Sequence, residues 1–151
     1  MSQSARDIYQ RHLDTVSEAM WSEDHDRVAQ MMHYPHTMIY SDRQQIVRAP
    51  EELAETSRLA KQRLLDMGAS AYHRVCLSAE FDVASPSRII GRHMTFVLNG
   101  GTYLVPPYQG RMTLEIQDHL WRGIGILTEV DPTKINLLHP DLSEPRASID
   151  T

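Results

Sequence analysis

The sequence has few of the features that mark secreted, membrane-spanning or disulfide-bonded proteins. Its 151 residues include a single cysteine, Cys76, which excludes an internal disulfide and fits a reducing compartment. No stretch approaches the ~20 apolar residues that a membrane span needs. The N-terminal residues are polar and lack the apolar segment of a signal peptide. These absences predict a cytoplasmic protein that does not enter a membrane.

Concentrated charge is missing as well. The formal net charge is -5, the two signs are interspersed, and no segment is rich in Lys and Arg, so we expect no nucleic-acid partner. Hydrophobic residues make up 41% and charged residues 23%, as in ordinary globular proteins. We expect a single domain over residues 1–131, followed by a polar and partly disordered C-terminal extension over residues 132–151.

The first part of the chain has the hydrophobic spacing of helices. Residues 4–23 form an apolar stripe at helical spacing, and Asp24 can cap a short second helix that Pro35 ends. A third helix is predicted to begin at Pro50, where proline suits the first helical position, and to end before Gly68.

The remaining segments alternate with the period of strands. Asn99-Gly100-Gly101 is typical of a hairpin turn, and Pro106-Pro107 predicts a bulge or bend because proline cannot donate to a ladder. Asp118-His119 indicates a tight turn. The predicted strands are 36–40 and 45–48, which form a hairpin around Asp42-Arg43, and then 71–83, 88–98, 102–117 and 120–130.

This order of elements resembles the nuclear transport factor 2-like superfamily, which includes ketosteroid isomerase, scytalone dehydratase and the SnoaL-type polyketide cyclases. The resemblance covers residues 5–131. Its local marks are residues 21–28 (WSEDHDRV) between the first two helices, Tyr40-Ser41-Asp42 at a strand end, and Leu120-Trp121-Arg122 at the start of the last strand. It implies an α+β, cystatin-like cone, in which a strongly curved antiparallel or mixed sheet wraps around three helices from the N-terminal half. It also implies a homodimer through the outer sheet face.

The superfamily contains enzymes and binding proteins, so the fold alone does not decide the function. Where ketosteroid isomerase has its catalytic aspartate, the alignment places Tyr40, a poor base at neutral pH. Where it has its oxyanion-hole tyrosine, the alignment places Val16. We therefore reject ketosteroid isomerase chemistry. Scytalone dehydratase-like chemistry needs converging histidine, tyrosine and aspartate, and no spacing in the chain proves that convergence.

The strand at residues 36–40 carries the first candidate site. His36, Met38 and Tyr40 share one face, and the resemblance favours that face pointing into the cone; the alternative is that Thr37 and Ile39 point inward instead. His36 could transfer a proton and Tyr40 could donate a hydrogen bond.

His12 lies within the apolar stripe of the first helix, where it is either a core residue or a proton-transfer group. The pair His33 and His36 has a metal-like spacing, but Pro35 separates the two rings and no carboxylate or cysteine completes a ligand set. We predict no metal and no cofactor.

Further histidines, arginines and the cysteine are assigned by strand alternation. His73 falls on the more apolar face of its strand and is predicted to be buried, with Cys76 on the polar face. His93 is expected on the outer face or at a dimer contact. The faces of Arg74 and Arg92 stay open; an arginine inside the cone would indicate an acidic ligand, and one outside would be an ordinary surface charge.

The leading hypothesis is a SnoaL-like protein that binds an apolar or aromatic small molecule, with cofactor-free dehydration, isomerisation or cyclisation as the chemistry. The alternative is a non-enzymatic protein-interaction or assembly module, which predicts a cone filled by side chains and an apolar patch outside it. The aromatic candidates could form the pocket wall, or Trp121 could be core packing with Tyr108 near the rim. The predicted ligand-binding residues are Tyr9, Val16, Met38, Tyr108, Met112 and Trp121.

Overall fold

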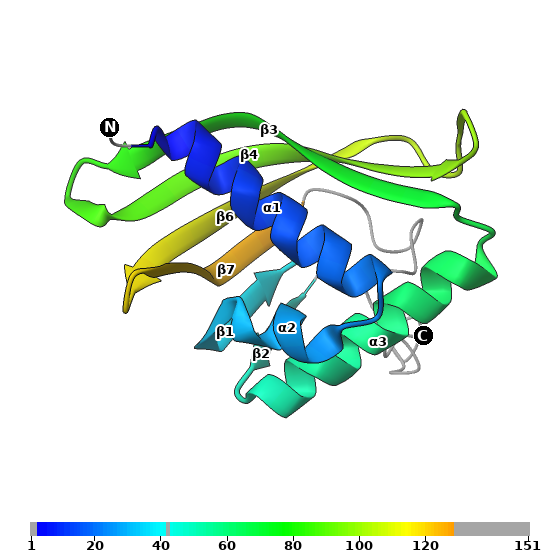
Figure 1. The fold of residues 1–151 in the computed structure, drawn as a ribbon, viewed down its shortest axis with the longest axis horizontal. Helices are drawn as coiled ribbons and strands as arrows, with labels where there is room; N and C mark the ends of the chain where they lie inside the picture. Colours follow the sequence, from blue (N-terminus) through cyan, green and yellow to red (C-terminus); the bar gives the residue numbers. More distant parts are fainter. Residues whose placement is uncertain (1–2, 42, 129–151) are drawn as a thin grey trace.

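The computed structural model describes residues 3–41 and 43–128. Within them, the first half of the chain is mainly helical and the second half is a set of long strands (Figure 1). The predicted C-terminal extension, residues 132–151, lies outside the described residues. The same holds for residue 42 in the predicted hairpin turn and for residues 129–130 at the end of the last predicted strand. The elements are α1 (Ala5–Trp21), α2 (His25–Gln30), β1 (Met32–Ile39), β2 (Gln44–Val47), α3 (Pro50–Asp66), β3 (Ala71–Asp82), β4 (Ser85–Asn99), β5 (Thr102–Tyr103), β6 (Tyr108–Gln117) and β7 (Leu120–Thr128).

Local signals define the helix ends. The Asp24 side chain accepts a hydrogen bond from the Arg27 backbone N–H, which caps α2 as predicted. Pro50 occupies the start of α3, and Gly68 follows that helix with φ of +89°, a left-handed conformation that glycine adopts without strain. These three predictions are confirmed.

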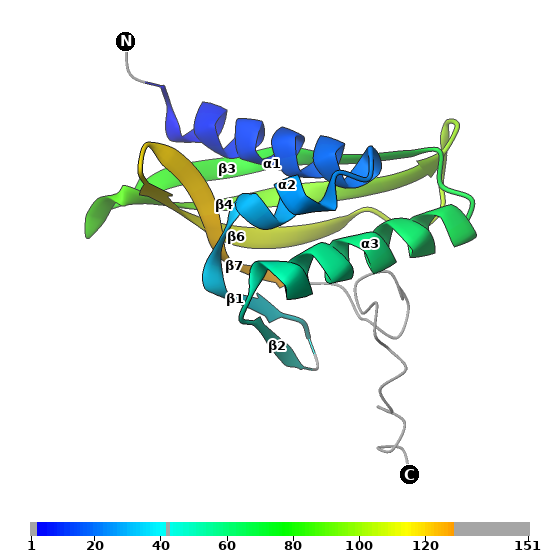
Figure 2. The same ribbon diagram turned by 60° about the horizontal axis from the view of Figure 1, so that its bottom comes forward.

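The strands form one curved, unclosed mixed sheet in the order β2-β1-β7-β6-β4-β3, with β5 paired to β4. β1 and β7 pair in parallel, whereas the other neighbouring strands are antiparallel. The three helices lie along the inside of this sheet, α1 beside β3 and α3 near β1 and β2 (Figure 2). The predicted α+β class with a curved sheet and three helices is confirmed.

Two predicted boundaries are wrong. α2 ends at Gln30 and β1 begins at Met32, so that Pro35, which was expected to end the helix, lies inside the strand. The strand predicted over 102–117 is two strands, β5 and β6, separated by the bend expected at the two prolines. The pattern could not separate a proline that ends a helix from one that interrupts a strand.

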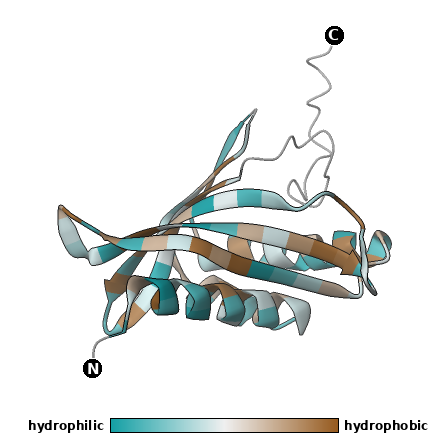
Figure 3. Cartoon of the chain, turned by 90° about the horizontal axis from the view of Figure 1, so that it is seen from above, coloured by the Kyte–Doolittle hydropathy of each residue, from teal (hydrophilic) through white to brown (hydrophobic). Residues whose placement is uncertain are grey.

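The face assignment of β3 is also wrong. His73 and Val75 are exposed, whereas Arg74 is half-buried and Cys76 is buried. The polar residues face inward because α1 covers this edge strand: the Gln10 side chain donates to the Arg74 carbonyl and accepts from the Cys76 backbone N–H. Hydrophobic residues occur at intervals along the long strands (Figure 3), and some of them, such as Val75, Leu77 and Ile90, are exposed.

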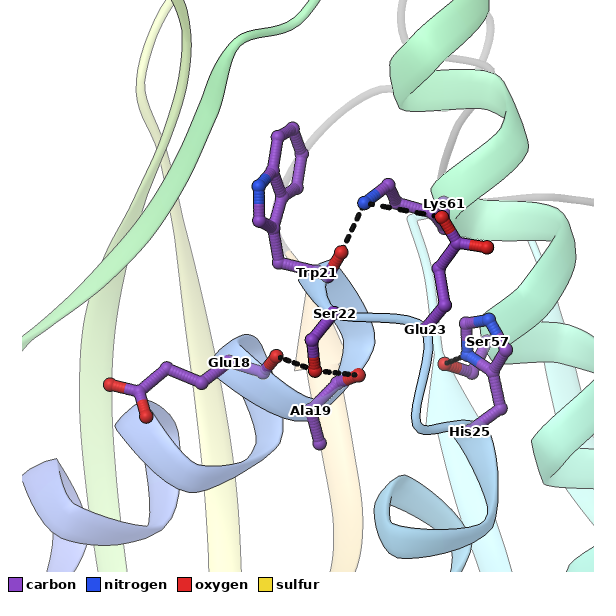
Figure 4. Close-up of polar contacts among 8 residues, drawn as sticks. All are labelled: Glu18, Ala19, Trp21, Ser22, Glu23, His25, Ser57 and Lys61. Carbon is purple, nitrogen blue, oxygen red and sulfur yellow. Dashed lines mark hydrogen bonds and ion pairs between the residues drawn. The ribbon is translucent and has the colours of Figure 1, made fainter.

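A buried lysine joins α1 to α3. Lys61 is 7% exposed, and its ammonium group donates to the Trp21 carbonyl at the end of α1 (Figure 4). The same nitrogen lies 4.0 Å from the centroid of the Trp21 ring and 3.9 Å from a Glu23 carboxylate oxygen. Beside it, Nδ1 of His25 lies 2.7 Å from the Ser57 hydroxyl. These contacts link the end of α1, and the start of α2, to α3.

None of the described helices is long and apolar enough to cross a membrane.

Candidate functional site

A cavity of about 150 Å³ lies between the inner sheet face, α1 and α3. Its walls are mainly apolar, with Met20 from α1, Leu53 and Leu64 from α3, and Met112 from β6. Polar groups enter from several elements. They are Ser17, His36, Tyr40, Thr56, Ser57, Tyr72, Arg74 and Thr128.

β1 supplies the residues that the sequence had placed together. His36, Met38 and Tyr40 all line the cavity, so the alternating face of the strand that carries them points inward. Ile39, on the opposite face, is 37% exposed. β1 and Tyr40, the residue that follows it, therefore put one imidazole and one phenol on the same cavity wall.

The His36 ring is oriented by β7. Its Nδ1 lies 3.2 Å from the Gly123 carbonyl oxygen, and because that oxygen can only accept, Nδ1 carries the hydrogen. Nε2 is then the proton-accepting nitrogen. His36 is 2% exposed, and burial lowers the pKa of its imidazole to about 4, an effect that the hydrogen bond to Gly123 partly offsets. The ring is neutral at pH 7.

His12 lies close to the same glycine without lining the cavity. A Cβ on Gly123 would be 2.9 Å from Met32 Sδ, which is too close, and in ordinary contact with His36 Cε1 at 3.5 Å and His12 Nε2 at 3.6 Å, so both rings lie beside this glycine. His12 is 3% exposed, and apart from a contact with the Trp121 backbone its ring nitrogens have no hydrogen-bond partner in the described part of the chain. Burial, followed by the positive charge of Arg74, lowers the pKa of His12 to about 3.

The predicted ligand-binding residues divide into two groups. Val16, Met38 and Met112 line the cavity. Tyr9, Tyr108 and Trp121 do not line it. Tyr9 is fully buried in the cluster between α1 and the sheet, Tyr108 is packed in the larger core cluster, and Trp121 is half-buried with its ring 6.3 Å from that of Phe81.

The structure adds a cationic and a phenolic group that the sequence reading left unassigned. Arg74 and Tyr72 from β3 both line the cavity. Their strand alternation places them on one face, but the opposite face is more apolar and was taken for the inner one. For the same reason His93, expected on the outer face, is in fact 2% exposed and lies against α1.

The chemistry of the cavity follows from this set. It offers a neutral imidazole that can accept a proton, phenol and hydroxyl groups that can donate hydrogen bonds, and one guanidinium group. None of the described lining residues is Asp or Glu. No group of three or more His, Cys, Asp or Glu among the described residues is placed to hold a metal ion.

Solved structures share this architecture. A protein of unknown function from Mycobacterium tuberculosis matches with a TM-score of 0.65 and 12% identity, covering 93% of this chain and 88% of that one. A protein of unknown function with a cystatin-like fold from Nostoc punctiforme matches with a TM-score of 0.63 and 14% identity, over 90% and 99% of the two chains. An NTF2-like protein with a cystatin-like fold from Novosphingobium aromaticivorans matches with a TM-score of 0.62 and 13% identity, over 89% of each chain.

The chain has the nuclear transport factor 2-like fold. No family model matches its sequence, and no curated protein sequence matches it. At such low identities the likeness of these NTF2-like structures concerns the fold alone, so the function has to be argued from the cavity itself.

Proposed function

We propose that the protein binds a mainly apolar small molecule in the cavity, in the manner of SnoaL-like proteins. The observation that carries this proposal is the cavity, whose volume of about 150 Å³ is comparable to that of an engineered apolar cavity that binds benzene. An apolar cavity with a few convergent polar groups is the usual form of a small-molecule site. One six-membered ring with a short substituent fits this description.

The polar groups support cofactor-free acid–base chemistry. In the proposed step, Nε2 of His36 takes a proton from a carbon next to a carbonyl group. The electron pair of the broken C–H bond forms a carbon–carbon double bond, and the π electron pair of the carbonyl group moves to its oxygen. Tyr40 donates a hydrogen bond to that oxygen as it becomes negative. The negative charge raises the pKa of the nearby imidazole, so the ring is a stronger base in the reacting complex than in the empty cavity. Return of the proton to the same carbon gives exchange, and in a substrate with an adjoining carbon–carbon double bond its return to the far carbon of that double bond completes an isomerisation.

Binding is tested by thermal unfolding with a panel of single-ring compounds, such as toluene, phenol and cyclohexanone. A ligand that binds only the folded state stabilises it by about 2.7 kcal/mol at a concentration of 100 times its Kd. Ala60→Phe, which places a ring into the cavity wall, is expected to abolish this stabilisation. Leu65→Phe, on an exposed position of the same helix, is expected to retain it. Equal responses in the two variants would contradict a site in the cavity.

Acid–base chemistry is tested by deuterium exchange from heavy water into cyclohexanone, followed by mass spectrometry. The protein is expected to accelerate exchange at the carbons beside the carbonyl, and His36→Ala is expected to remove that acceleration while the protein stays folded. Exchange at the same rate in His36→Ala would contradict the role of His36. Absence of exchange in the unmodified protein, with binding intact, would leave a binding protein rather than an enzyme.

The alternative function, a protein-interaction module, predicts a cone filled by side chains, and the cavity counts against it. Apolar residues on the outer sheet face, namely Val75, Leu77 and Ile90, are 46%, 38% and 46% exposed. We propose that two copies of the chain pair through this face, as in the homodimer that the family resemblance implies. Sedimentation equilibrium tests it: Val75→Glu together with Ile90→Glu should yield a monomer, and an unmodified protein that is already monomeric would contradict the pairing.

A further inference from the structure

Arg74 brings a positive charge to the cavity. Its Nε donates to the Ser17 hydroxyl at 2.9 Å, which anchors the guanidinium group against α1. The ion pairs within the described part of the chain are formed by other residues, so no carboxylate there neutralises Arg74. Asp14 and Glu18 border a groove on the outer side of Arg74, but neither lies within ion-pair distance of it.

On the side of the cavity, the side chains around this charge are neutral. Burial, and after it the charge of Arg74, lowers the pKa of both His12 and His93 to about 3, so both rings are uncharged at pH 7. None of the described residues that line the cavity is Asp or Glu. The apolar walls lower the local dielectric constant, which strengthens the attraction of the guanidinium group for an anion that enters the cavity.

The anion that fits is a carboxylate. The planar guanidinium group matches a carboxylate in a paired arrangement of two hydrogen bonds. A phosphate group carries more charge, and Arg74 is the one arginine among the described residues lining the cavity. We infer that the ligand of the proposed site is a single-ring carboxylic acid whose carboxylate pairs with Arg74 while its ring lies against the apolar wall. This inference rests on the proposed function and names the ligand class of the same cavity.

The test compares an acid with its neutral counterpart by isothermal titration calorimetry at pH 7.5. Benzoate and benzamide have nearly the same shape, so their affinity ratio reports the pairing with the cation. We expect benzoate to bind the unmodified protein at least about tenfold more tightly, since hydrogen bonds to charged groups are the stronger ones. In Arg74→Met the benzoate affinity should fall to that of benzamide, while the benzamide affinity stays within about twofold.

Two variants control for folding and for net charge. Arg92→Met removes an exposed arginine from the neighbouring strand β4, and the benzoate preference should survive it. Arg74→Lys keeps the charge but not the paired hydrogen bonds, so it should retain part of the preference. If Arg74→Met does not fold, the lysine variant and the acid-to-amide ratio of the unmodified protein still decide the question.

The outcomes separate the two proposals. Equal binding of benzoate and benzamide to the unmodified protein would overturn the carboxylate inference and leave the small-molecule site intact. A benzoate preference that persists in Arg74→Met but disappears in Arg92→Met would also overturn it, because the anion would then bind on the outer face. Failure of benzoate, benzamide and the neutral single-ring compounds to bind at all would overturn both the site and the inference.

Discussion

The hydroxyl group of Tyr9, on α1, lies 2.7 Å from Nδ1 of His93, on β4, and both side chains are buried. Burial raises the pKa of the Tyr9 phenol and lowers the pKa of the His93 imidazole, so both groups are neutral. One hydrogen atom lies between the phenol oxygen and Nδ1. This hydrogen bond is the direct polar link between the first helix and the centre of the sheet.

Tyr9→Phe should keep the packing of the ring and leave His93 Nδ1 without a partner. An unsatisfied buried polar group costs about 1–3 kcal/mol, so the free energy of unfolding measured with urea should fall by that amount. Tyr103→Phe, at a 57% exposed position, is the matched control and should change it by less than about 0.5 kcal/mol. Equal effects of the two substitutions would show that the hydrogen bond does not contribute to stability.

Gly91 makes room for Tyr9. A Cβ on Gly91 would lie 2.4 Å from the Tyr9 ring, whereas a Cβ on Gly101 would meet nothing within 4 Å. Gly91→Ala should therefore displace the ring and destabilise the protein by about 1–3 kcal/mol, the usual range for overpacking. Gly101→Ala should have little effect. Urea unfolding of both variants checks the difference, and a stable Gly91→Ala protein would mean that α1 can shift away from the sheet at low cost.

Mild acid should destabilise the fold through its buried histidines. The pKa values of His12, His36 and His93 are lowered from 6.5 to about 3, 4 and 3, so the unfolded chain takes up protons that the folded protein does not. The free energy of unfolding therefore has its full value above pH 6.5. It falls as the pH decreases toward 4, by about 1.4 kcal/mol per pH unit for each ring. Urea unfolding between pH 7.5 and 5 measures this slope.

His93→Gln tests the same effect with one ring removed. The slope of stability against pH should decrease by the contribution of one histidine, whereas His73→Gln, at an exposed position, should leave it unchanged. Identical slopes in the unmodified protein and His93→Gln would contradict a buried, uncharged His93.

Lys61→Met should weaken the contact between α1 and α3 and lower the free energy of unfolding. The methionine keeps much of the buried stem but leaves the Trp21 carbonyl without its donor, at a cost of about 1–3 kcal/mol. Arg58→Met, which removes an exposed ion pair with Glu55 from the same helix, should cost much less. If urea unfolding gives equal losses, the contact between Lys61 and Trp21 is not what holds the helices together.

Local chemistry was enough to predict three helix boundaries and one hairpin turn, although not the end of α2. Asp24, Pro50 and Gly68 act within a few residues of their own position, and each is found in its expected role. The hairpin at Asn99-Gly100-Gly101 is also local, with Gly100 at φ of +60°. Signals of this kind do not depend on what the rest of the chain does.

The residues that line the cavity could not be predicted from the sequence in the same way. The rule that the apolar face of a strand points inward fails on β3, where Val75 is exposed and Arg74 lines the cavity. The closeness of His12 and His36 depends on the pairing of β1 with β7 and on the packing of α1 against β7, which bring both rings to Gly123. Both facts arise from long-range contacts, which periodicity within one segment does not encode.

The proposed binding of a small molecule inside the cone is tested most directly by the methionine methyl groups. Met20, Met32, Met38 and Met112 line the cavity, whereas Met94 lies on β4 away from it. In carbon-13 methyl NMR spectra, a single-ring ligand such as benzoate or phenol should shift the four cavity signals together, saturably, and leave the Met94 signal in place. Shifts confined to Met94, or no shift of the four cavity signals with any ring compound, would contradict the account.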